Sequence, residues 1–184
     1  MEIKFWICLS TLCLALLLMF CNKKIRCSQL IKDAFSVFKD NRNEKVYWYD
    51  LLTFFGCPVI ISVSVIFGFN YWFNKEMAST LLNVFSIMFT LLFGVISILT
   101  STIESNDEIR KKITKEAFAT ASFSMLISFL NLVILIVYIA LQQFEMPTII
   151  FMFLSGIVIV LSLIMMMLFF MIIKRSYITS ISNK

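Results

Sequence analysis

Long apolar stretches separated by short polar segments determine the organisation of this chain. Five of them reach or approach the roughly 20 residues that a helix needs to cross a bilayer core about 30 Å thick. They occupy residues 5–21, 49–73, 79–103, 117–141 and 148–173. Together they hold 118 of the 184 residues, and Asp50 is the one formal charge among them. The pattern predicts an all-α, polytopic membrane helix bundle with five transmembrane helices, in a single membrane domain that covers residues 1–184.

The first apolar stretch has a second interpretation. Residues 1–4 followed by a short apolar run are also typical of a secretory signal peptide. However, the run ends at residues 18–21 without a small-x-small cleavage site, and Lys23, Lys24 and Arg26 directly after it oppose translocation. We therefore expect five spans with a retained first helix. The alternative is four spans preceded by an N-terminal signal or anchor.

The distribution of cations predicts the orientation of these spans. Fourteen Lys and Arg residues lie in the 22–48 loop, the 104–116 hairpin loop and the C-terminal tail, whereas the opposite side carries Lys4 and Lys75. Because cytoplasmic loops are enriched in Lys and Arg, we expect the N-terminus outside and the C-terminus in the cytoplasm.

Aromatic residues and one proline mark the second span in particular. Amphipathic rings suited to headgroup depth flank both of its ends: Tyr47, Trp48 and Tyr49 on the cytoplasmic side, and Tyr71 and Trp72 on the outer side. Pro58 lies inside this span, where its missing N–H and its ring predict a kink.

Small and polar residues inside the third and fourth spans recur at helical spacing. In the third span they advance by about 3.6 residues per step and so share one helix face: Asn83, Ser86, Thr90, Gly94, Ser97 and Ser101. Ala117 begins a similar row in the fourth span, which continues through Thr120, Ser124, Ser128 and Asn131.

The two rows have matching positions in an antiparallel hairpin. Pairs at equal depth, such as Ser97 with Ser124 and Thr90 with Asn131, have residue numbers that sum to 221 or 222. We therefore expect the rows to face each other, because small residues let helix backbones approach and interhelical hydroxyl and amide groups can hydrogen-bond. The alternative is that the row of the third span lines a water-filled path in an oligomer.

Two polar segments on the predicted cytoplasmic side are candidate docking surfaces. In the 22–48 loop, apolar residues at helical spacing predict an interfacial helix, which either floats on the inner leaflet or docks a partner. The fourth helix is expected to begin near Asp107 and to project about two turns beyond the membrane. The cations that could bind lipid headgroups or a soluble partner are Lys23, Lys24, Arg26, Lys32, Lys39, Arg110, Lys111, Lys112 and Lys115.

Composition argues against most catalysis. The chain is 60% hydrophobic, its mean hydropathy is +0.93 and it contains no histidine, the commonest general base and metal ligand. We therefore expect no enzymatic activity, no cofactor and no metal site. We attribute the net charge of +5 to the orientation of the chain in the membrane and to contacts with lipid headgroups. Direct nucleic-acid binding is therefore not expected.

Three function classes remain: a membrane subunit that docks a cytoplasmic partner, a pore former that depolarises the membrane, and, least favoured, a small transporter or membrane enzyme. In size and span packing, and in the glycine- and hydroxyl-rich stretch Leu81–Thr102 followed by Glu104–Lys115 and a further apolar span, the chain resembles the membrane subunit of the Kiwa anti-phage defence system. That resemblance implies a tetrameric homo-oligomer in the bacterial inner membrane. It would sense phage attack and control a cytoplasmic DNA-binding effector.

Overall fold

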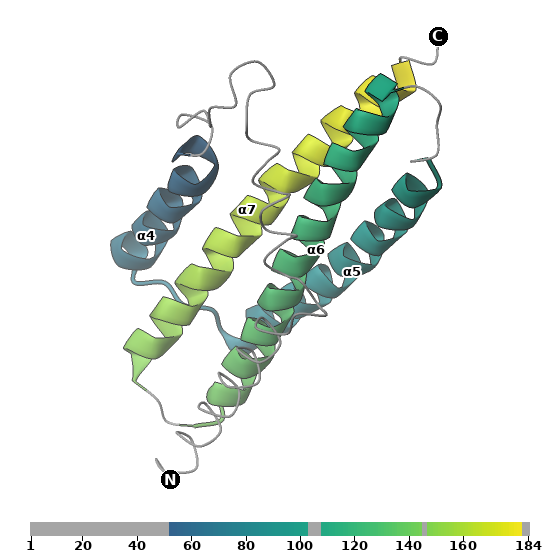
Figure 1. Ribbon diagram of the computed structural model, residues 1–184. Coiled ribbons are helices and arrows are strands. Elements are labelled where there is room, and N and C mark those ends of the chain that lie inside the picture. The colour runs from purple at the N-terminus through teal and green to yellow at the C-terminus, as the bar shows by residue number, and fades with distance from the viewer. Residues whose placement is uncertain (1–51, 103–107, 145–146, 182–184) are drawn as a thin grey trace, which may run out of the picture.

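The computed structural model describes residues 52–102, 108–144 and 147–181, and all of the regular elements in these ranges are helices (Figure 1). Four of these helical segments are long and apolar enough to cross a membrane. This confirms an all-helical, multi-pass architecture for the described part of the chain. The first predicted span, 5–21, and the 22–48 loop lie outside the described residues.

The second predicted span consists of two kinds of helix. A π-helix, η1, covers Leu52–Gly56 and leads directly into α4, Cys57–Phe69. The buried Pro58 lies in the first turn of α4, where it needs no N–H partner, so the predicted kink position coincides with a junction between helix types. The helix stops at Phe69 rather than at residue 73, because Asn70 takes a left-handed conformation, with φ 48° and ψ 44°.

The other three helices extend beyond the predicted spans. Helix α5, Lys75–Thr102, begins four residues before its predicted span, and the side chain of Asn74 caps it by accepting a 2.8 Å hydrogen bond from the Met77 N–H. Helix α6, Glu108–Leu141, begins next to the predicted start at Asp107. Helix α7, Thr148–Ile181, begins at the predicted residue. At 34 residues each, α6 and α7 are about 51 Å long and exceed the thickness of a bilayer core.

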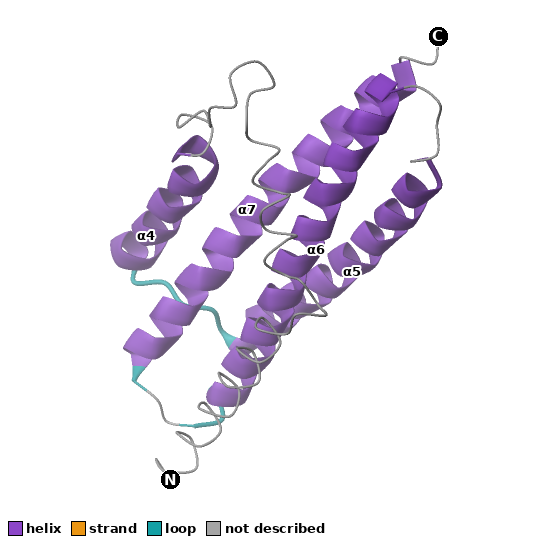
Figure 2. Cartoon of the chain, in the orientation of Figure 1, coloured by secondary structure: helices purple, strands orange, loops and turns teal. Residues whose placement is uncertain are grey.

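The helices lie side by side in the order α4, α7, α6, α5 (Figures 1 and 2). Helix α6 packs between α5 and α7, whereas α4 packs against α7. The loop from Asn70 to Asn74 therefore connects helices at opposite edges, although short connections usually join neighbours. The five loop residues therefore pass α7 and α6, the two helices that lie between these edges.

Buried polar contacts hold this crossing loop in place. The Phe73 N–H donates to Ser155 Oγ at 3.3 Å, and the Phe73 carbonyl accepts from Tyr138 Oη at 2.6 Å and from Gln142 Nε2 at 3.0 Å. The Ser155 hydroxyl in turn donates to Tyr138 Oη at 3.3 Å. One loop is thus tied to both α6 and α7, which fixes where α5 begins.

The core follows a heptad pattern along α6. Buried positions alternate three and four residues apart, and each is at most 2% exposed: Thr114, Ala117, Ala121, Ser124, Ser128, Asn131, Leu135 and Tyr138. This spacing is typical of helices that pack at a shallow angle with interdigitating side chains. Buried residues of the two neighbouring helices complete the core: Ala78, Phe85 and Leu92 from α5, and Val158, Met165 and Ile172 from α7.

Candidate functional site

The row of small polar residues on α6 lies inside the protein. Thr120, Ser124, Ser128 and Asn131 are all buried. Two of the hydroxyls bond to their own helix, Thr120 to the Glu116 carbonyl at 2.8 Å and Ser124 to the Thr120 carbonyl at 3.0 Å. The third, Ser128, donates across the interface to the Phe85 carbonyl of α5 at 3.2 Å. Small side chains on α6 therefore allow close backbone approach.

The row on α5 has the opposite environment. Asn83, Ser86, Thr90, Gly94 and Ser97 are all exposed, on the face that points away from α6. A Cβ added at Gly94 would meet no atom within 4 Å. The hydroxyls of Ser86, Thr90 and Ser97 donate to carbonyls four residues earlier in the same helix, at 2.9, 3.0 and 3.1 Å. The side chain of Ser101, at the end of this row, lies outside the described part of the structure.

The two rows therefore do not face each other, contrary to the register expected from the sequence. The contact between Ser128 and Phe85 gives a residue-number sum of 213 rather than 221. The reason is steric. Helix α5 turns large apolar residues toward the small residues of α6. Large side chains packed against small ones fill an interface more completely than small side chains on both helices would. The α5 row is left on the outer surface.

Two asparagines in these rows lack hydrogen-bond partners in the described structure. Asn83 is exposed on the outer face of α5, eight residues and about 12 Å along the helix from Lys75. Asn131 is fully buried in α6, and neither its Nδ2 nor its Oδ1 has a partner there. Unpaired amides are costly in an apolar environment. These two residues are therefore the least satisfied polar groups of the two rows.

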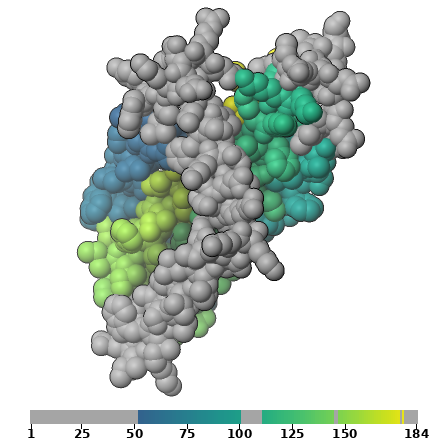
Figure 3. All heavy atoms as spheres, in the orientation of Figure 1, coloured from purple at the N-terminus to yellow at the C-terminus, as the bar shows by residue number. Residues whose placement is uncertain are grey.

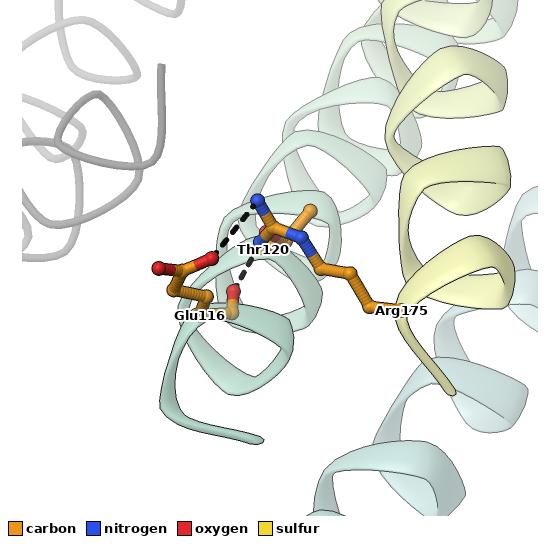
Figure 4. Close-up of polar contacts among 3 residues, drawn as sticks. All are labelled: Glu116, Thr120 and Arg175. Atoms are coloured by element: carbon orange, nitrogen blue, oxygen red, sulfur yellow. Dashed lines mark hydrogen bonds and ion pairs between the residues drawn. The ribbon is translucent and has the colours of Figure 1, made fainter. Parts of the chain in front are cut away.

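Arg175 joins α6 and α7 at the end where α6 begins (Figure 4). Its Nη2 lies 3.4 Å from Glu116 Oε2, and its Nη1 donates to Thr120 Oγ1 at 2.9 Å. The two charged side chains are 15% and 32% exposed, so the pair is partly shielded from solvent. The sequence did not single out this pair. The sequence did contain a signal for this pair, because Glu116 and Arg175 are opposite charges at equal depth in an antiparallel α6–α7 hairpin.

The same end of α6 and α7 carries the described docking candidates. Lys111, Lys112 and Lys115 are exposed on α6, and Lys174 is exposed beside Arg175 on α7. The side chains of the remaining candidates lie outside the described residues: Lys23, Lys24, Arg26, Lys32, Lys39 and Arg110.

At the opposite end, the predicted interface aromatics lie in the loop between α4 and α5. Tyr71 is half-buried and forms an edge-to-face contact with Phe73, whereas Trp72 is 46% exposed. The other predicted set of interface aromatics lies outside the described ranges: Tyr47, Trp48 and Tyr49.

The hydrogen-bonded cluster around Tyr138 was also missed from the sequence. Tyr138 is fully buried, and its ring contacts both Phe73 and Phe151 edge-on, at 6.2 and 5.5 Å between ring centres. Its position one turn before Gln142 was the available signal, because a tyrosine in an apolar span needs a partner for its hydroxyl. The cluster is structural: it closes one end of the bundle.

Comparisons of the chain with protein-family models, with curated proteins and with solved structures found no match. The function is therefore inferred from the geometry of the four described membrane helices.

Proposed function

We propose that this protein is a non-enzymatic integral membrane subunit that self-associates through the outer face of α5. The observation that carries the proposal is the exposed row from Asn83 to Ser97, which lies within a segment apolar enough to span a membrane. The proposal further locates the protein in a bacterial inner membrane, with the Glu108 end of α6 in the cytoplasm.

Asn83 supplies the strongest reason for self-association. Its amide makes no hydrogen bond among the described residues, and lipid hydrocarbon offers it no partner. In a symmetric oligomer the same residue from each copy meets near the symmetry axis, where amides can bond to one another. Such interhelical bonds contribute about 0.6 kcal/mol each on average.

The rest of the row suits a close contact between copies. Ser86, Thr90 and Gly94 have small side chains, and the two hydroxyls are already bonded within their own helix. Another α5 could therefore approach closely without leaving a buried hydroxyl unsatisfied. The face combines small side chains with one amide that lacks a hydrogen-bond partner among the described residues. This combination is expected of an interface between membrane helices.

Disulfide cross-linking tests this assignment. In a chain whose native cysteines are replaced, Ser86→Cys should form disulfide-linked dimers in membranes, because the α5 faces of two copies meet. The matched control is Met166→Cys on α7, which is 53% exposed and lies at a similar depth by the antiparallel register of the bundle. Equal cross-linking at both positions, or none at Ser86→Cys, would show that α5 is not the contact.

The cytoplasmic end is proposed to dock a soluble partner with an acidic surface. Exposed lysines project from parts of α6 and α7 that exceed the bilayer thickness, and the Arg175–Glu116 pair fixes the two helices relative to each other there. By its resemblance to the Kiwa membrane subunit, the chain would act in anti-phage defence, with this partner as the effector.

A pull-down tests the docking proposal. Charge reversal of Lys111, Lys112 and Lys115 should remove a cytoplasmic protein that co-purifies with the unaltered chain. Reversal of Lys75, which lies at the opposite end, is the control. Recovery of the same proteins with every variant would contradict docking at this end.

A pore is the second candidate, favoured by the exposure of the same α5 row. If the copies turn this row toward a central axis, the hydroxyls of Thr90 and Ser97 line a path that water can enter. Purified protein in planar bilayers should then conduct, and Thr90→Leu with Ser97→Leu should reduce the current. The exposed apolar neighbour Ile87, changed to Leu, is the control. Absence of current, or current indifferent to the pair, removes this candidate.

A further inference from the structure

An apolar groove of about 690 Å³ lies between α4 and α7. Its floor is formed by the buried residues Ser62, Ile66 and Gly156, and its rim by exposed side chains that include Val63, Phe67 and Phe153. The volume is within the range of about 300–1,000 Å³ that is typical of small-molecule sites. In the space-filling view, α4 and the beginning of α7 form a continuous surface at one edge of the molecule (Figure 3).

The floor of the groove is a tight helix contact. Ser62 Oγ donates to the Gly156 carbonyl at 2.9 Å, so the floor offers no unused hydroxyl donor. A Cβ at Gly156 would lie 2.5 Å from Cδ1 of Ile66, which shows how closely the two helices approach. Among the described helices, α4 packs on α7 and not on α5 or α6, so neither α5 nor α6 covers the groove beside this contact.

The groove covers one half of the membrane thickness. On α4 it runs from Val59 to Asn70, eleven residues or about 16 Å, close to the roughly 15 Å depth of one leaflet. Val59 lies near the middle of the Leu52–Phe69 span, and the last lining residue on α7, Leu161, lies near the middle of the Thr148–Arg175 span. At its other end, Asn70 adjoins the exposed Trp72, a residue type that favours headgroup depth.

The depth of the groove favours a lipid chain as the occupant, because the groove extends over one leaflet whereas a transmembrane helix crosses both. An extended hydrocarbon chain is narrower than a helix and runs parallel to the groove. We propose that the groove is a binding site for one acyl chain of a phospholipid, taken from the leaflet at the Asn70 end.

Photo-cross-linking of the full chain tests this site. The protein is reconstituted into phosphatidylcholine vesicles that contain a trace of phosphatidylcholine with a diazirine on one acyl chain, and the labelled residues are mapped by mass spectrometry. Labelling should concentrate on the groove residues of α4 and α7. The reference is the exposed apolar face of α5, which includes Val84 and Leu91. Equal labelling of both surfaces would overturn the proposal.

Matched substitutions separate binding in the groove from general lipid contact. Val63→Phe should reduce groove labelling to the level of the reference face, because the added ring fills the site. Val84→Phe should leave groove labelling unchanged, since Val84 is 46% exposed, against 48% for Val63, and lies outside the groove. Val160→Phe on the α7 side gives an independent check if Val63→Phe fails to fold. Groove labelling that survives the folded filling variants would show that the chain is not bound there.

A cysteine probe identifies the competing occupants. Val63→Cys should remain a free thiol under oxidising conditions if a lipid chain fills the groove. A disulfide between two copies would show that the groove is a protein interface. A disulfide to Cys8 or Cys13 of the same chain would show that the 5–21 segment fills it. Either disulfide would overturn the proposal, and neither outcome depends on whether the α5 faces of two copies meet.

Discussion

The outer face of α5 and the inner face of α6 carry the same kinds of residue in opposite environments. Both present serines, threonines and an asparagine at helical spacing. Those of α6 are buried between two helices, whereas those of α5 are exposed on the surface of the bundle. Residue type and periodicity therefore define a face but do not determine what covers it.

The hydroxyl groups explain why one composition serves both faces. Ser86 and Thr90 on α5 donate to carbonyls of their own helix, and so do Thr120 and Ser124 on α6. Such a side chain is small, and its hydroxyl donor already has a hydrogen-bond partner. Lipid, a neighbouring helix or water can therefore lie against it. Burial follows the number of neighbouring helices: among the described helices, α6 packs on two and α5 on one.

Enlarging one residue on each face should produce the largest difference between them. Ser128→Leu should lower the free energy of unfolding by about 3 kcal/mol, because the larger side chain has no space between α6 and Phe85. Ser86→Leu should change it by less than about 0.5 kcal/mol, because Ser86 is exposed. The measurement is denaturation in detergent, at a protein concentration where the chain is monomeric. Similar losses for both variants would mean that the two faces are not different.

The apolar pattern was sufficient to locate the four described helical segments that are long and apolar enough to cross a membrane. The end of α6 at Leu141 and the start of α7 at Thr148 agree with the sequence prediction. Two other ends differ for local reasons. The apolar run continues past Phe69, so the left-handed turn at Asn70 gives no signal in hydropathy. Helix α5 begins within charged residues at Lys75, because the side chain of Asn74 caps it.

The arrangement of the helices could not be predicted in the same way. The sequence gives a face for each helix, but the crossing of the 70–74 loop depends on contacts between distant residues, such as Phe73 with Tyr138 and Ser155. That crossing separates α4 from α5. The expected pairing of the two polar rows failed for a related reason: it assumed small-against-small packing, whereas Phe85 occupies the interface.

Breaking the ion pair at the Glu108 end should have an intermediate effect. This pair lies on the side of α6 that faces α7, so it tests whether α6 is held by polar contacts on that side too. Arg175→Met should lower the free energy of unfolding by about 1 kcal/mol, because it removes the contacts to Glu116 and Thr120 from a partly exposed site.

The control for this prediction is the adjacent residue. Lys174→Met removes the same charge from an exposed position and should leave stability within about 0.5 kcal/mol of the parent. A double-mutant cycle between Arg175→Met and Glu116→Gln should show coupling. Additive effects of the two changes would mean that the pair does not contribute to holding α6 against α7.

The two asparagines provide the finest distinction between the faces. Leucine has the same branching as asparagine, so Asn131→Leu replaces two unpartnered buried polar atoms with methyl groups of similar placement. It should raise the free energy of unfolding by less than about 1 kcal/mol, because removing the unpaired amide eliminates a desolvation cost that exceeds the small cost of repacking. Asn83→Leu should leave the unfolding of the monomer unchanged but reduce the cross-linking of Ser86→Cys, because Asn83 has no role within its own bundle. Loss of stability in Asn131→Leu would mean that this amide is hydrogen-bonded after all. Unchanged cross-linking in Asn83→Leu would remove the argument that its amide drives the association of α5 faces.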